Sequence, residues 1–374
     1  MPEHEGDDSS WAWLYLIAVS AAFAAYLLGL LLLSRAGAAA RRRAVVTLAC
    51  AVQLLPLAGP VLLSTDVYTY WDYARIGAVH GGNPYVDEPS DFPEDVAYPL
   101  MGSRWHDTTS VYGPGFTLAS EVHAEAVGES ADAAAWTYRA LAALAMVALV
   151  LLAARLSAQP AFAAAFVGWN PLLAVHFAGG GHNDAWMMAF VLGALALAAA
   201  GRPFLAGLSW GAAIAVKWVP LLFLPLRLLE ARRTGRRLDH RGLAVGLGII
   251  VAIATWRFGL SWLGAAGPLA TNLAEERARY SLPARLASLG PPEGAVVVVF
   301  ALGFVAAYAW LLREAWRGRA RLALTAGLLL VCTSWLVPWY AVWAVPLAAV
   351  EEDRTARALA LALSAYLLRD AVPL

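Results

Sequence analysis

The sequence predicts an all-α fold, a polytopic transmembrane helical bundle of about 10–11 helices in which one hairpin is broken or re-entrant. Two observations support this prediction. Hydrophobic residues make up 60% of the 374 residues and charged residues only 14%, so the chain has more apolar surface than a soluble domain can bury. Apolar runs of about 20 residues, the length that crosses a bilayer, also alternate with short arginine-rich loops. Residues 1–374 are therefore expected to form a single membrane-embedded domain.

The first two apolar runs, within residues 11–64, set the predicted topology, because short basic loops stay in the cytoplasm. The first helix ends at Arg35 and Arg41, so its amino-terminal end is predicted to lie outside. The second helix then leads outward into a polar stretch, residues 65–134, which we interpret as an external loop. Loops of this length are uncommon unless they have a function.

Residues 135–374 hold the remaining helices. The segment 203–226 lies between loops that both belong in the cytoplasm, and at about 1.5 Å per residue it is too short for two full spans. Pro220 interrupts it. We therefore predict a re-entrant or broken hairpin with Lys217 near its tip, lining a cavity. The other helices are expected near residues 135–154, 160–177, 185–200, 242–263, 293–312, 322–337, 340–350 and 356–371.

The charge balance and the cysteines exclude some classes of function. The 27 basic and 27 acidic residues cancel, so nothing indicates a nucleic-acid partner. The two cysteines, Cys50 and Cys332, lie in apolar runs and are interpreted as small hydrophobic residues. His176 and His182 have no matching carboxylate cluster, so neither a metal nor another cofactor is expected.

Asp66 is the first candidate for chemistry. It lies where the second helix meets the outer surface, and Tyr70 follows at i+4 on the same helical face. A carboxylate beside aromatic rings at the membrane edge is suited to act as a general base for a sugar hydroxyl. The alternative is that Asp66 caps a helix and the aromatic residues form an interfacial belt. Asp72, on a different face, is a second candidate.

A second polar cluster, His182-Asn183-Asp184, follows three glycines in the next external turn. Glycines let a backbone approach a ligand closely, and polar side chains at a helix start can bind one. The alternative is a flexible turn whose Asp184 caps the next helix. Tyr112-Gly113-Pro114 and Asn83-Pro84-Tyr85 are turn sequences with aromatic residues, for which turn geometry is the expected role.

Three basic residues are candidates for binding phosphate. Lys217 is the only lysine in the chain, and a lysine in an apolar hairpin is costly unless it meets water, an anion or a partner. Its alternative role is to extend to the nearest interface. Arg257 is placed near the outer end of a helix and Arg277 in the last large external loop; a solvated charge or an interface anchor is the usual role of each.

Several motifs, in this order and at these positions along residues 60–345, resemble one known family. They resemble the polyprenol-phosphate-mannose-dependent α-1,6-mannosyltransferases of the GT-C superfamily. The motifs are Asp66 itself, GGNPY (81–85), YGP (112–114), WNP (169–171), GGGHNDA (179–185), AVKWVPLLFLP (215–225) and VPWY (337–340).

The resemblance implies a multi-pass plasma-membrane enzyme of GT-C type with its active site facing the extracytoplasmic side. It implies inverting transfer of a hexose, with mannose expected, from a polyprenyl-phosphate donor to an envelope glycan or lipoglycan acceptor. Asp66 then matches the presumed base, His182-Asn183-Asp184 the second external polar motif, and Lys217 the membrane-embedded lysine. We expect Lys217, with Arg257 or Arg277, to hold the phosphate, and Tyr70, Tyr112 and Asp72 to contribute to substrate binding. The lipid bilayer is the remaining expected partner.

Two other classes of function stay open at the sequence level. A secondary transporter or flippase-like carrier also has broken helices and an intramembrane lysine, although it usually shows an internal repeat. A non-catalytic scaffold for envelope assembly is the third possibility. The enzyme interpretation depends on Asp66 and Lys217 opening onto one shared chamber.

Overall fold

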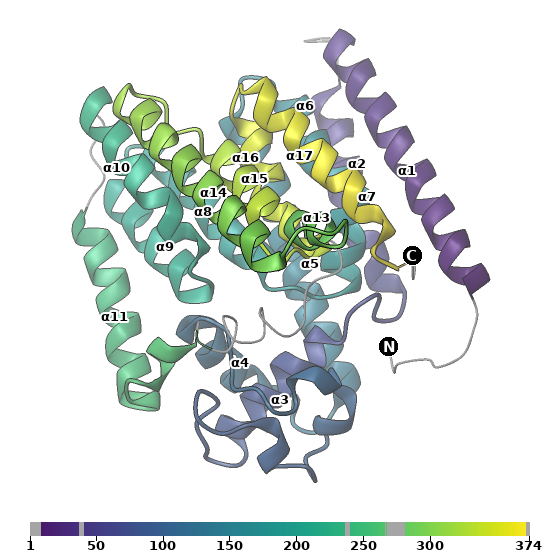
Figure 1. The fold of residues 1–374 in the computed structure, drawn as a ribbon, viewed down its shortest axis with the longest axis vertical. Helices are drawn as coiled ribbons and strands as arrows, with labels where there is room; N and C mark the ends of the chain where they lie inside the picture. The colour runs from purple at the N-terminus through teal and green to yellow at the C-terminus, as the bar shows by residue number, and fades with distance from the viewer. Residues whose placement is uncertain (1–8, 37–40, 236–239, 266, 268–280, 372–374) are drawn as a thin grey trace.

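The computed structural model describes residues 9–36, 41–235, 240–265, 267 and 281–371 (Figure 1). Over these residues the fold consists of helices and contains no strand, so the predicted all-α class is confirmed. The long helices pack side by side in one bundle. Helices α3 (Asp66–Ala78) and α4 (Pro114–Val127) form a smaller unit at one end of this bundle, seen at the bottom of Figure 1.

Four described helices are long and apolar enough to cross a membrane: α1 (Ser9–Ala36), α5 (Ala131–Leu156), α11 (His240–Phe258) and α14 (Glu293–Trp316). In each of the four, less than half of the most apolar stretch is buried inside the protein; the buried share is highest in α5, at 44%. Exposed apolar faces of this length are stable in lipid, which confirms the polytopic transmembrane prediction.

A fifth apolar segment, long enough to be a broken span or a re-entrant loop, has a bend that the sequence did not predict. Helices α6 (Pro160–Gly168) and α7 (Pro171–Ala174) meet at an angle, and the pair Pro160–Gly168 and Pro171–Gly179 bends by 53°. We expected one helix near residues 160–177, and the structure has a bent pair of helices there. The break has a local cause, because Pro171 has no N–H and the side chain of Asn170 accepts a hydrogen bond from Leu172 N. A π-helical turn, η6 (Val175–Gly179), completes the second half.

Several expected spans are shorter than a bilayer needs. The apolar runs near 44–64 and 322–337 form only α2 (Arg42–Leu54) with η2 (Leu55–Ala58), and α15 (Leu322–Cys332). Proline and glycine near their ends, such as Pro56 and Gly59, stop the helices early. The other short elements are α8 (Asp184–Ala199), α13 (Leu282–Ala287), η9 (Pro338–Trp343), α16 (Val345–Val350), α17 (Arg354–Leu367) and η10 (Leu368–Ala371).

The predicted hairpin is present, with Lys217 at its turn. Helix α9 (Pro203–Val216) ends at Lys217, whose backbone is extended, and the chain returns through η7 (Val219–Leu222) and α10 (Phe223–Thr234). Helix α9 packs between α8 and α11, whereas α10 packs against α14. The two ends of the hairpin lie at the same level of the bundle, because Gly242, shortly after α10, lies against the backbone of Phe204.

The stretch 65–134 is not the simple loop that the sequence suggested. Besides α3 and α4 it contains the short turns η3 (Pro89–Asp91), η4 (Tyr98–Leu100) and η5 (Ser103–Trp105). We call this unit, residues 65–130, the cap. Buried aromatic side chains and a buried ion pair between Arg75 and Asp95 (2.7 Å) hold the cap together.

The cap is fastened to the end of α11. The Asn83 side-chain amide donates to the Phe258 carbonyl and to the Ser261 hydroxyl in η8 (Ser261–Gly264), both at 3.0 Å. Arg257 pairs with Glu121 of α4 at 3.1 Å. The GGNPY motif thus has the turn-forming role that we expected for Asn83-Pro84-Tyr85, and it fixes the cap to the bundle.

Candidate active site

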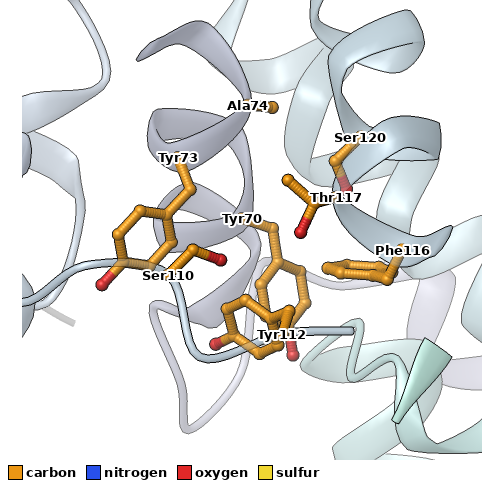
Figure 2. A pocket seen from close by; sticks show the side chains of 8 residues that line it. All are labelled: Tyr70, Tyr73, Ala74, Ser110, Tyr112, Phe116, Thr117 and Ser120. Carbon is orange, nitrogen blue, oxygen red and sulfur yellow. The ribbon is translucent and has the colours of Figure 1, made fainter. Parts of the chain in front are cut away.

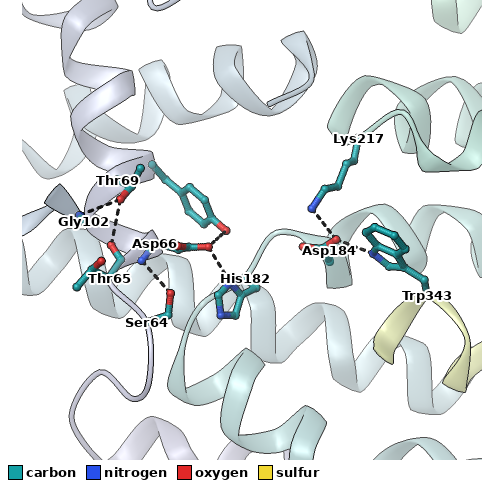
Figure 3. Close-up of polar contacts among 10 residues, drawn as sticks. Ser64, Thr65, Asp66, Thr69, Gly102, His182, Asp184, Lys217 and Trp343 are labelled. Atoms are coloured by element: carbon teal, nitrogen blue, oxygen red, sulfur yellow. Dashed lines mark hydrogen bonds and ion pairs between the residues drawn. The ribbon is translucent and has the colours of Figure 1, made fainter. Parts of the chain in front are cut away.

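Asp66 lies at the first turn of α3, with its carboxylate directed away from the helix (Figure 3). Asp66 Oδ2 lies 3.1 Å from His182 Nδ1 and accepts a longer hydrogen bond, 3.4 Å, from the Tyr70 hydroxyl. Thr65, and not Asp66, occupies the N-cap position, and no side-chain capping bond is formed there. The capping alternative for Asp66 is therefore wrong, and its carboxylate belongs to a tertiary contact.

His182, which contacts Asp66, is itself covered by the ring of Trp339. Its side chain is completely buried, and the indole of Trp339 stacks on its ring with centroids 3.7 Å apart. His182 Nε2 has no hydrogen-bond partner among the described residues. Because the His182 ring is enclosed while the Asp66 side chain retains about 12% exposure, Asp66 is the member of the pair that a substrate can reach.

Asp184 and Lys217 form the second pair of the site (Figure 3). Asp184 Oδ1 accepts hydrogen bonds from Lys217 Nζ at 2.8 Å and from Trp343 Nε1 at 2.6 Å. The ammonium also lies over the rings of Tyr340 and Trp343, 4.7 and 5.5 Å from their centroids. Lys217 therefore does not extend to an interface but is held and largely neutralised inside the protein.

One turn joins the two pairs, since His182 and Asp184 are separated only by Asn183. The Asn183 amide is buried, and neither of its polar atoms has a hydrogen-bond partner in the described part of the chain. Buried polar groups normally have partners, so free ones beside a candidate site indicate where a polar ligand can bind. The sequence-predicted cluster His182-Asn183-Asp184 is thus brought together with Asp66 and Lys217 in one place.

The glycines before this turn allow the close approach that brings its residues together. Gly181 has φ +74°, which L side chains rarely adopt, and a Cβ atom there would collide with Val67 of α3. Arg139, which is buried, donates from Nε to the Ala178 carbonyl at 2.9 Å and from its terminal nitrogen to Gly59 at 2.8 Å. Arg139 therefore fastens the turn to the end of η2.

Gly113 of the YGP motif positions Lys217. Its N–H donates to the carbonyl of Val216, at 3.2 Å, immediately before Lys217 in the chain. A Cβ on Gly113 would collide with the backbone of Ala215 and Val216. The motif therefore acts through close backbone packing against the end of α9.

Tyr70, whose hydroxyl donates to Asp66, belongs with Tyr112 to an aromatic cluster (Figure 2). The Tyr70 ring meets the edges of Tyr112 and Phe116, each at 5.0 Å between centroids. A gap of about 160 Å³, a volume that includes open solvent, is lined by eight buried side chains: Tyr70, Tyr73, Ala74, Ser110, Tyr112, Phe116, Thr117 and Ser120. This gap lies between α3 and α4, so the chamber expected between Asp66 and Lys217 stays a prediction.

Two of the predicted site residues that the structure describes, Asp72 and Arg257, have no described contact with the two pairs. Asp72 is buried elsewhere in the cap, where burial and the charge of Asp95 raise the pKa of its carboxyl to about 7. Arg257 is occupied by Glu121 and by the Gly82 carbonyl, so it fastens the cap to α11. Arg277 lies outside the described residues.

Residues that the sequence analysis did not single out also line the site. Trp343 donates to Asp184, and Arg104 of η5 lies against the rings of Trp105 and Trp335 at 5.2 Å from each centroid. Burial raises the pKa of Asp66, but the hydrogen bond and charge of His182 and the charge of Arg104 outweigh this effect, so the pKa lies below its ordinary value. Asp66 is therefore ionised at neutral pH.

Comparison with known proteins gives one family. Residues 4–232 match the family model described as "Alpha-(1->6)-mannopyranosyltransferase, N-terminal domain". The chain is 29% identical over 231 residues to alpha-(1->6)-mannopyranosyltransferase A of Mycobacterium tuberculosis, covering 55% of this chain and 44% of that protein. It is 27% identical over 245 residues to alpha-(1->6)-mannopyranosyltransferase A of Corynebacterium glutamicum, covering 58% and 49% respectively. The chain thus spans less than half the length of these relatives. No solved structure matches it.

Proposed function

Because this chain belongs to the alpha-(1->6)-mannopyranosyltransferase family, we propose that it is an inverting glycosyltransferase that transfers mannose from a polyprenyl-phosphate donor to a glycan or lipoglycan acceptor. The observation that supports this best is that one turn contributes a residue to each of two pairs, Asp66–His182 and Asp184–Lys217. There the Asp66 carboxylate and the Lys217 ammonium lie on the two flanks of His182-Asn183-Asp184.

In the proposed reaction Asp66 is the general base. It accepts the proton of the acceptor hydroxyl while the hydroxyl oxygen forms a bond to the anomeric carbon of the sugar. The bond from that carbon to the phosphate oxygen breaks, and the electron pair leaves with the lipid phosphate. Attack opposite the leaving group inverts the anomeric configuration, through a state with oxocarbenium character.

The ionised state of Asp66 suits this role, because the carboxylate already has the free electron pair that accepts a proton. His182 is a positioning residue, since its buried ring fixes one carboxylate oxygen and leaves the other for the acceptor. Lys217 has three N–H donors and uses one on Asp184, so the remaining donors are available to the sugar or to the phosphate.

We further propose that the reaction takes place at the outer face of the membrane. Helix α11 runs from the arginine-rich region near residue 240 to the cap, where Phe258 binds Asn83. At 1.5 Å per residue its 19 residues span about 28 Å, close to the thickness of the hydrocarbon core. Arginine-rich loops stay in the cytoplasm, which supports an outward-facing cap and active site.

The test uses the purified full chain with radiolabelled polyprenyl-phosphate mannose and an α-mannan oligosaccharide. We expect the label to move to the oligosaccharide, and Asp66→Asn to lower the rate by about 10²- to 10⁴-fold, the usual contribution of a general base. Asp107→Asn, at an exposed position in the cap, is the matched control and should retain the wild-type rate. Reconstituted vesicles that move the labelled lipid across the bilayer unchanged would instead indicate a carrier.

A further inference from the structure

The proposed reaction needs a cation for the departing phosphate, and the charges of two of the three predicted candidates are already offset; the third, Arg277, lies outside the described residues. Lys217 is paired with Asp184 at 2.8 Å, and Arg257 with Glu121 at 3.1 Å. A positive charge that a carboxylate already neutralises stabilises a developing anion less than an unpaired one does. Among the described residues, an arginine or lysine without a carboxylate partner is therefore better suited to this role than Lys217 or Arg257.

Arg104 is such a group. No carboxylate among the described residues forms an ion pair with it, and its residue is exposed. Its guanidinium lies against two aromatic rings: the centroids of Trp105 and Trp335 are each 5.2 Å from it and 6.5 Å from one another. Ring faces hold a guanidinium in place without neutralising its charge, and they leave its N–H edge free.

Two contacts place the segment of Arg104 near Asp66 and near the segment that covers His182. Gly102 donates to the Thr69 hydroxyl at 3.4 Å and lies against Thr65, the residue that precedes Asp66. Trp335, four residues before Trp339, belongs to the segment that leads into the cover of His182. The charge of Arg104 also acts on Asp66, where it contributes to the lowered pKa of that carboxyl.

We propose that Arg104, held against the rings of Trp105 and Trp335, binds the phosphate group of the lipid-linked donor. This inference rests on the proposed function for the identity of the donor. The planar guanidinium presents paired N–H groups that match two phosphate oxygens, which the single ammonium of Lys217 does not. As the sugar departs, negative charge grows on this phosphate, and Arg104 stabilises it. Trp335 comes from the carboxyl-terminal half, so both halves of the chain build the binding site.

The experiment measures equilibrium binding of radiolabelled decaprenyl phosphate to the purified full chain in detergent, which requires no transfer. We expect Arg104→Gln to raise Kd by about 10- to 100-fold, as for loss of hydrogen bonds to a charged group, and Arg104→Lys to restore part of the affinity. Arg202→Gln is the matched control, because this exposed arginine lies at the opposite end of α9 from Lys217. Its Kd should stay within about twofold of wild type, as usual for surface positions.

A second arm separates the donor phosphate from the phosphate of ordinary lipids. Wild type and Arg104→Gln should bind nanodiscs containing phosphatidylglycerol with the same affinity. If Arg104→Gln loses as much affinity for these nanodiscs as for decaprenyl phosphate, the proposal is overturned. A wild-type Kd for decaprenyl phosphate in Arg104→Gln would overturn it as well. If the wild type binds decaprenyl phosphate through Arg104 but transfers no mannose, the proposed function fails and the phosphate site stands.

Discussion

Trp339 lies flat on His182, with ring centroids 3.7 Å apart and 11° between the ring planes. The stack fixes the imidazole that contacts Asp66 at 3.1 Å, so an aromatic residue of η9 controls the orientation of a carboxylate in α3. The site is therefore assembled from segments far apart in the sequence, and its parts can be tested one at a time.

The first prediction concerns this stack. Trp339→Ala should uncover His182 and let the Asp66 carboxylate rotate, lowering kcat by about 10-fold, because small misplacements of a reacting group are costly. Trp339→Phe keeps a ring face and should retain most of the activity. Steady-state kinetics of mannosyl transfer measure both, with Trp136→Ala on the exposed face of α5 as control. Equal rates for the alanine and phenylalanine variants would mean that the stack has no such role.

The second prediction concerns the pair Lys217–Asp184. Lys217→Met leaves a buried carboxylate with Trp343 as its only described side-chain partner, so it should destabilise the fold by about 3 kcal/mol. The double variant Lys217→Met/Asp184→Asn removes the uncompensated charge and should recover much of this loss. Thermal unfolding followed by tryptophan fluorescence measures both. Identical melting temperatures for the single and double variants would contradict a coupled pair.

The third prediction separates backbone strain from crowding at Gly181. Gly181 and Gly81 have similar φ values, +74° and +69°, but only at Gly181 would a Cβ collide with Val67. Alanine at Gly81 should cost about 1–2 kcal/mol from strain alone. Alanine at Gly181 adds about 1–3 kcal/mol of overpacking, and it should also lower kcat because the turn moves away from α3. Stability and transfer assays on the two variants give the comparison.

The fourth prediction is a pH dependence of stability from Asp72. In the folded cap burial raises the pKa of this carboxyl from 3.8 to about 7, so the folded state holds a proton that the unfolded chain releases near pH 4. The contribution of Asp72 to stability is therefore full below about pH 4, falls as the pH rises to about 7, and is constant above it. The Asp72→Asn variant has no carboxyl to ionise at this position, so it should not lose this stability as the pH rises.

Melting temperatures of wild type and Asp72→Asn at pH 5, 6, 7 and 8 test the sign. The advantage of the asparagine variant should grow up to about pH 7 and then level off. Asp107→Asn, at an exposed position of the same cap, should show no such trend. An advantage that shrinks with rising pH would mean that Asp72 is stabilised as an anion.

The sequence predicted the elements whose cause is local. Hydropathy located the spans α1, α5, α11 and α14, and the arginine-rich loops required the hairpin whose turn is Lys217. The bend at Asn170 was missed because hydropathy gives the length of an apolar run and not its direction, although a proline inside such a run indicates a break.

The contacts of the site depend on tertiary packing, which one sequence does not reveal. Trp343 binds Asp184 across 159 positions, and Glu121 occupies Arg257 across 136. Periodicity and hydropathy contain no information about such pairs, so Arg257 resembled a free phosphate ligand. Arg104 was overlooked for the opposite reason, because one arginine in a polar stretch has the same pattern as any solvated charge.

The π-helical turn over Val175–Gly179 has a consequence for how this site tolerates change in length. A π turn holds one residue more than an α turn, and each residue of an α-helix advances the chain by about 100° around its axis. Deleting one residue from this turn would produce a regular helix and a more ordinary backbone. It would also rotate His182 away from Asp66, so the helix would become more regular while the contact between these two residues would be lost.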